Sequence, residues 1–189
     1  MTIQLISCPI CGFEAEKLHA ADGFDGLAIK CPHCGSFSLS GSLESMLPTI
    51  KESDSLAEAK LSHGLRNTQK ENAPTLLTTE KCDAILKMPL PKPREQADLM
   101  IRWFAESHQE LGKAVNLNYK NHGAIIGSQS AISFAFTMDY MIQSGFLYGK
   151  PAEFMNISHN QYPLFLTVTG WDYYDQMRTR KEFYGEFKK

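Results

Sequence analysis

Apolar residues at helical spacing predict a helix between residues 53 and 72. They fall on one helical face, and Ser53 or Asp54 can cap the start of that helix. The face consists of Leu56, Ala57, Leu61 and Leu65. The run Asn72-Ala73-Pro74 stops the pattern, and a second, shorter helix is predicted over residues 79–87.

Prolines separate this helical segment from the rest of the chain. Residues 88–93 contain three prolines, which cannot form a helix interior and favour a stiff connector. We therefore expect a helical connector over residues 46–92, ending in this Pro-rich linker, and a further domain over residues 93–189.

Helical periodicity returns after the linker. A helix is predicted over residues 94–112, where Gly112 suits the end. Its apolar face consists of Ala97, Met100, Ile101, Phe104 and Leu111. Leu117 lies in a short extended stretch, and a short helix is expected over residues 122–127.

A longer helix and two strands complete the predicted domain. Ser128 is expected to cap a helix over residues 129–144, which Gly145 ends. Residues 146–148 and 164–167 look like two strands joined by a polar loop, and residues 169–171 open a final helix. Helix, short helix, longer helix, two-stranded wing and closing helix is the order of a winged-helix domain.

The N-terminal segment carries the strongest chemical signal. Its cysteines form two Cys-Pro-x-Cys-Gly knuckles, residues 8–12 and 31–35, and the glycine permits the positive φ that such a turn needs. The residues between the knuckles suffice for a strand, a turn at 23–26 and a returning strand. We predict that Cys8, Cys11, Cys31 and Cys34 bind one structural Zn²⁺ in a zinc ribbon over residues 1–45.

Other uses of these side chains stay open. A redox Cys-x-x-Cys centre needs only one pair, and an iron–sulfur cluster also takes four thiolates. His33 and His19 are alternative ligands, but four cysteines already satisfy tetrahedral zinc. Cys82 fits a small buried apolar residue better than a nucleophile.

The predicted fold class is α+β, mostly α. The amino-acid composition is consistent with this prediction. Hydrophobic residues make up 43% and charged residues 21%, as in an ordinary soluble protein. Residues 1–7 lack the charged and apolar regions of a signal peptide, and no window approaches the apolar length of a membrane span. We expect a cytoplasmic protein without membrane contact.

Charge argues against DNA as the main partner. The net charge is −2, and residues 122–149 contain no Lys or Arg and a single acid, Asp139, so that counterion release from DNA would contribute little there. The helix over 129–144 is apolar on both faces, which favours burial in its own core or against another chain. We expect a protein partner or self-association, with DNA binding as the alternative.

Motifs for catalysis are not evident. The chain lacks a Gly-rich phosphate loop, a His-Glu-x-x-His helix and a Ser/His/Asp motif. His108 with Glu110, and Asp172 with Asp175, are neighbours in sequence, but such pairs are common on exposed helix ends. We therefore expect no catalytic residue, no cofactor besides zinc and no enzymatic activity in this chain.

Short matches extend the zinc-ribbon pattern to a family resemblance. Besides the two knuckles and the stretch Asp25 to Lys30, they cover Leu61 to Arg66, Pro91 to Asp98 and Leu166 to Trp171. The chain resembles the N-terminal region of a group of bacterial proteins, where this region precedes a domain similar to TIR domains or nucleoside deoxyribosyltransferases in architectures associated with antiphage defence. The resemblance would place the start of that effector domain near Lys189, so no catalytic residue is carried over.

Together these features predict a zinc-binding regulatory, sensing or assembly module that is linked to antiphage defence. It would act through protein or ligand binding. The alternative is a DNA-binding transcriptional regulator that uses the zinc ribbon and the winged helix.

Overall fold

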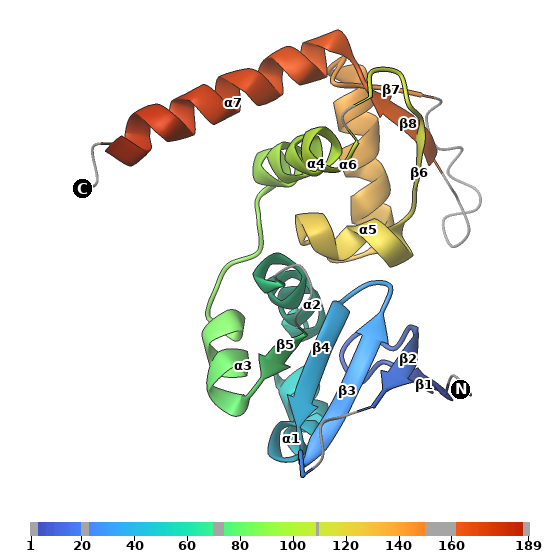
Figure 1. Cartoon of the computed structure of the whole chain (residues 1–189), viewed down its shortest axis with the longest axis vertical. Coiled ribbons are helices and arrows are strands. Elements are labelled where there is room, and N and C mark those ends of the chain that lie inside the picture. Colours follow the sequence, from blue (N-terminus) through green and yellow to red (C-terminus); the bar gives the residue numbers. More distant parts are fainter. Residues whose placement is uncertain (1–3, 20–22, 70–73, 109, 150–161, 187–189) are drawn as a thin grey trace. The chain divides into compact units, whose positions relative to one another are not determined.

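The chain divides into two compact units. The computed structural model describes residues 4–19, 23–69, 74–108, 110–149 and 162–186 (Figure 1). The first unit comprises residues 1–90 and 120–129, and the second comprises residues 91–119 and 130–189. The polar loop predicted between residues 148 and 164 and the helix end predicted at Asn72-Ala73 lie largely outside the described residues.

A five-stranded sheet organises the first unit. Its strands are β1 (Gln4–Ser7), β2 (Glu14–Leu18), β3 (Gly26–Cys31), β4 (Gly35–Ser40) and β5 (Thr75–Leu77), in the order β1-β2-β3-β4-β5. The first four pair antiparallel with their sequence neighbours, whereas β5 joins β4 in parallel (Figure 1). Along β4 the buried positions alternate at Gly35, Phe37 and Leu39, so one face of the strand meets the core.

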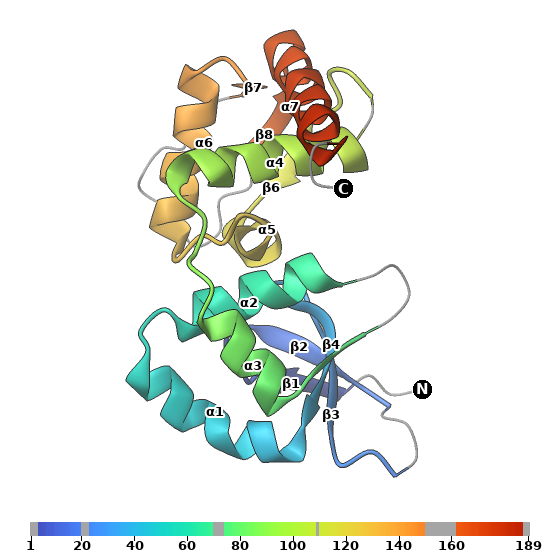
Figure 2. The same cartoon turned by 90° about the vertical axis from the view of Figure 1, so that its left-hand side faces the viewer.

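Three helices cover one face of this sheet. They are α1 (Gly41–Ser53), α2 (Ala57–Thr68) and α3 (Thr79–Leu86) (Figure 2). Leu43 and Leu47 of α1 and Leu61 and Leu65 of α2 are buried in a single cluster that also contains the four knuckle cysteines. The fold is thus mixed α/β, and the sheet and the helices share one core.

This shared core corrects the division that was expected near residue 45. Residues 46–90 do not form a separate connector, because their apolar side chains complete the core of the cysteine-bearing sheet. Strand β1, helix α1 and strand β5 were not predicted. Helix α1 contains Pro48, an unusual residue inside a helix, and β5 is only three residues long. In α1, Leu43, Leu47 and Ile50 nevertheless repeat at helical spacing.

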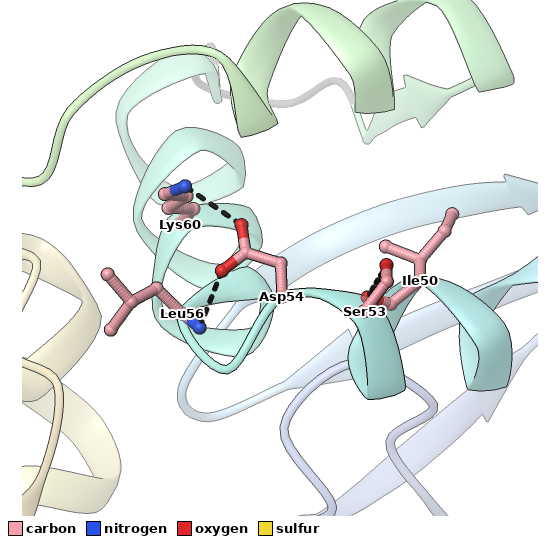
Figure 3. Close-up of polar contacts among 5 residues, drawn as sticks. All are labelled: Ile50, Ser53, Asp54, Leu56 and Lys60. Atoms are coloured by element: carbon pink, nitrogen blue, oxygen red, sulfur yellow. Dashed lines mark hydrogen bonds and ion pairs between the residues drawn. The ribbon is translucent and has the colours of Figure 1, made fainter.

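The corner between α1 and α2 is fixed by Asp54. Its carboxylate accepts one hydrogen bond from the backbone N–H of Leu56 and one from the ammonium of Lys60, each of 2.8 Å (Figure 3). The hydrogen bond from Lys60 holds the pKa of Asp54 below its ordinary value. Asp54, one of the two predicted capping residues, therefore follows the end of α1 and stabilises the start of α2 through these two hydrogen bonds.

The second unit combines helices with a small antiparallel sheet. Its elements are α4 (Pro93–Ser107), β6 (Val115–Leu117), α6 (Ala131–Gln143), β7 (Leu147–Tyr148), β8 (Tyr162–Leu166) and α7 (Val168–Glu186), with the strand order β6-β8-β7. Met100, Ile101 and Phe104 of α4 are buried, as their periodicity predicted. The two strands predicted over residues 146–148 and 164–167 are present as β7 and β8, which pair through Leu147 and Leu166.

Polar contacts tie α4 to the other helices of this unit. The guanidinium of Arg94 donates to the hydroxyl of Tyr173 over 2.7 Å and to that of Tyr140 over 3.3 Å, and Tyr173 donates to Asp98 over 3.0 Å. In the interior, the Thr137 hydroxyl lies 3.1 Å from the side-chain oxygen of Gln96. Both side chains are buried, so this bond lies between α4 and α6 out of contact with water.

Three expectations for this region are corrected. Helix α4 ends at Ser107 instead of 112, and Leu111 is 64% exposed instead of lying on its apolar face. Helix α6 is capped by Ser130, not Ser128, because the Ser130 hydroxyl accepts the backbone N–H of Ser133. The helix is also not buried all round, since Phe136 is 57% exposed.

Helix α5 (Tyr119–Ile126) completes the predicted order of elements but groups with the first unit over residues 120–129. Its backbone carbonyls at Lys120 and Ala124 lie 3.1 and 2.8 Å from Nδ1 of His33 and His63. The three helices of the expected winged helix are therefore not assigned to one compact unit. None of the helices in the described ranges has the length and apolar character that crossing a membrane requires.

Candidate metal centre

Two tight turns bring the knuckle cysteines into position. In the first turn the N–H of Gly12 donates to the carbonyl of Cys8 over 2.9 Å, and the N–H of Cys8 donates to the carbonyl of Phe13 over 2.8 Å. Gly12 and Gly35 have φ values of 73° and 83°, which side chains with a Cβ rarely adopt. The glycine that follows each knuckle is therefore required by the turn, as the sequence predicted.

The four predicted cysteines converge on one point. Their Sγ atoms all lie within 4.8 Å of one another, with 3.9 Å between Cys8 and Cys34 and 3.5 Å between Cys11 and Cys31. A tetrahedral zinc ion with Zn–S bonds of about 2.3 Å separates its sulfurs by roughly 3.8 Å. The quartet therefore has the size that a single zinc ion requires.

Burial gives the site a closed character. Cys8, Cys11, Cys31 and Cys34 are 1, 7, 2 and 0% exposed and belong to the core cluster of the first unit. Four thiolate ligands fill a tetrahedral coordination sphere, whereas catalytic zinc keeps a position for water or substrate. A metal ion bound here would have a structural role.

Hydrogen bonds within the quartet shift the pKa values of its thiols in opposite directions. Bonding with the Cys11 thiol is the largest cause that lowers the pKa of Cys8 and of Cys31. The pKa of Cys11 is raised chiefly by Cys31, and that of Cys34 chiefly by Cys11. A divalent cation that binds such a set displaces the thiol protons that remain.

The other predicted metal-binding candidates lie differently. His33 is 1% exposed, packs edge-on against Phe13 and directs Nδ1 to the carbonyl of Lys120, so it acts in packing. His19 is exposed and follows the end of β2. Cys82 is fully buried in α3, where burial raises the pKa of its thiol. Cys82 therefore has the buried apolar environment that its sequence context predicted.

Helix α2 surrounds the second knuckle with polar side chains. The Ser62 hydroxyl is buried 3.3 Å from Sγ of Cys34, and the amide of Gln69 donates to the carbonyl of Cys34 over 2.8 Å. Arg66 lies between them in sequence and, with Cys31 and Gln69, lines a cavity of about 510 Å³. Sequence reasoning missed this set, although the four-residue spacing of Ser62 and Arg66 places these two on one helical face.

The carboxylates considered for catalysis are engaged in local ion pairs. Glu110 lies 3.5 Å from Lys113, and Asp175 lies 3.7 Å from Arg178, with these side chains largely exposed. Such i,i+3 pairs are ordinary features of solvated helices and loops.

Comparisons with known proteins give no family assignment. No family model matches the chain, and neither the curated proteins nor the solved structures contain a significant match to it. The centre is therefore interpreted from its own geometry.

Proposed function

We propose that this protein is a zinc-stabilised regulatory, sensing or assembly module that acts through protein–protein contact. The observation that carries the proposal is the buried quartet of Cys8, Cys11, Cys31 and Cys34, whose sulfurs lie within 4.8 Å of one another. A closed thiolate site stabilises structure and leaves no position for a substrate. The function is therefore sought in the surfaces that the fold presents.

Helix α6 offers the surface that fits this role. Ile132, Phe136 and Tyr140 are 52, 57 and 40% exposed and follow one another at intervals of four residues. They form an apolar stripe along the helix, and exposed apolar patches of this kind mark protein-binding sites. The helix has no Lys or Arg, which weakens the case for DNA because phosphate contacts dominate DNA affinity.

A second copy of this chain is the partner that we propose for the stripe. The three side chains of the stripe carry no charge, and the neighbouring cation Arg94 is hydrogen-bonded to the Tyr140 hydroxyl. Two-fold self-association is the commonest form of assembly. The resemblance to the N-terminal regions of bacterial defence proteins agrees with such a role, in which assembly would regulate a linked effector.

Light scattering and sedimentation test the assembly role. We expect the zinc-loaded protein to self-associate, and Phe136→Asp to weaken self-association at least about tenfold, because truncation or charging of a central aromatic is costly. Leu111→Asp is the matched control, since Leu111 is exposed outside α6. A wild type that stays monomeric at high concentration would reject the proposal, and a salt-dependent shift of duplex DNA would favour the DNA-binding alternative.

Elemental analysis tests the metal directly. We expect one zinc per chain in protein purified without chelator, and Cys82→Ala should keep it. Protein without bound zinc would remove the basis of the proposal.

A further inference from the structure

One face of α2 is directed at the second knuckle. Ser62 and Arg66 lie four residues apart on one face of α2, and Gln69 is the residue that follows the end of the helix. Ser62 is fully buried with its hydroxyl 3.3 Å from Sγ of Cys34, and Gln69 donates to the Cys34 carbonyl over 2.8 Å. The two bonds place the hydroxyl beside the Cys34 sulfur and fix the backbone that carries this sulfur.

Arg66 lies between Ser62 and Gln69 in sequence, and the structure gives it no carboxylate partner among the described residues. Burial lowers the pKa of the Arg66 guanidinium, and the charges of Cys34 and Cys31 oppose this effect. Arg66 and Cys31 also line the same cavity, so the guanidinium-bearing side chain and the second knuckle lie in one region of this unit.

A zinc ion bound by four thiolates would carry a net negative charge that needs compensation. Four thiolates and one divalent ion leave two net negative charges. Net charge is costly in an interior of low dielectric unless opposite charge or hydrogen-bond donors compensate it. Arg66 and Ser62 provide one positive charge and one donor at the same knuckle.

A cavity borders the second knuckle on the side of Arg66. It measures about 510 Å³, and Cys31, Arg66 and Gln69 are among the residues that line it. Cys31 lines this cavity, but its side chain is only 2% exposed and that of Cys34 is fully buried, so a reagent reaches the second knuckle only when the site loosens. Charge compensation by a guanidinium lowers the nucleophilicity of a neighbouring thiolate.

We propose that Arg66 is a positioning residue of the zinc centre, which balances the charge of the second knuckle and thereby slows both zinc release and thiolate modification through the cavity. The proposal rests on the zinc assignment made above. Ser62 and Gln69 support the same knuckle through their hydrogen bonds, as outer-shell groups do in other metal sites.

Paired variants separate charge from packing. Arg66→Gln removes the charge and keeps a polar side chain, whereas Arg66→Lys keeps the charge. Lys17→Met is the control, because it removes a cation from an exposed position of β2. Zinc release to a chromogenic chelator and alkylation of Cys31 and Cys34, followed by peptide mass spectrometry, are measured on the full chain after circular dichroism has verified its helix content.

We expect Arg66→Gln to release zinc and to be alkylated about tenfold faster than the wild type, the range seen for outer-shell groups. Arg66→Lys should stay closer to the wild type, and Lys17→Met should match it. Equal rates for Arg66→Gln and Arg66→Lys, or wild-type rates for Arg66→Gln, would overturn the inference. Wild-type protein without zinc would instead overturn the proposed function.

Discussion

The contribution of the metal to stability can be isolated with two cysteines of the same core. Cys34 and Cys82 are both fully buried and belong to one hydrophobic cluster, but only Cys34 lies in the quartet. Alanine at either position removes one sulfur atom. The comparison of Cys34→Ala with Cys82→Ala therefore holds the packing loss nearly constant, while only Cys34→Ala removes a metal ligand together with its contact to the Ser62 hydroxyl.

The expected magnitudes differ widely. Loss of one buried heavy atom costs about 1 kcal/mol, with the cavity included. Structural zinc contributes roughly 10–16 kcal/mol in small zinc domains, and a domain is stable by only about 5–15 kcal/mol. If the three remaining thiolates still held zinc and a quarter of its contribution were lost, Cys34→Ala would lose roughly 2.5–4 kcal/mol beyond the packing loss, and complete loss of the ion costs more.

Metal content and thermal unfolding measure the difference. We expect Cys82→Ala to hold one zinc per chain and to unfold slightly below the wild type. Cys34→Ala should lose zinc and also part of its helical circular dichroism, because α1, α2 and α3 share the core of the cysteine-bearing sheet. Equal zinc content and equal unfolding temperatures of the two variants would refute the reasoning.

Two further predictions concern single polar side chains. Thr137→Val should lower the free energy of unfolding by about 1–3 kcal/mol in denaturant titration, because it leaves the buried oxygen of Gln96 without its donor; Thr169→Val, at an exposed position, should have little effect. Burial lowers the pKa of His63 from 6.5 in spite of its bond to the Ala124 carbonyl. The unfolded chain therefore binds the proton more readily, so stability should be full above pH 6.5 and fall below it, and His63→Gln should flatten this part of the profile measured at saturating zinc.

The sequence predicted what depends on neighbours along the chain. The Cys-Pro-x-Cys-Gly spacing identified the four cysteines that the structure brings together, because each knuckle is a local turn that its glycine permits. The helix over Thr79–Leu86 and the buried face of α4 followed from periodicity. Local geometry and local periodicity can be read from residues a few positions apart.

Other features depended on partners far away in sequence. Strand β5 is too short to show a pattern, and it exists because it pairs with β4 some 38 residues earlier, with Phe37 opposite Thr75. Helix α5 belongs to the first unit, where the Nδ1 atoms of His33 and His63 lie at hydrogen-bond distance from two of its backbone carbonyls. No local rule assigns these contacts.

The cysteine quartet shows where the two kinds of information meet. By itself the sequence determined which four residues supply thiolates, since ligand type and spacing are written in the chain. Only the tertiary structure decided that Ser62, Arg66 and Gln69 stand around the second knuckle and that α1, α2 and α3 share its core. Packing between distant segments places these groups, because a helix presents one face to its neighbours and the identity of the neighbour is set by the fold.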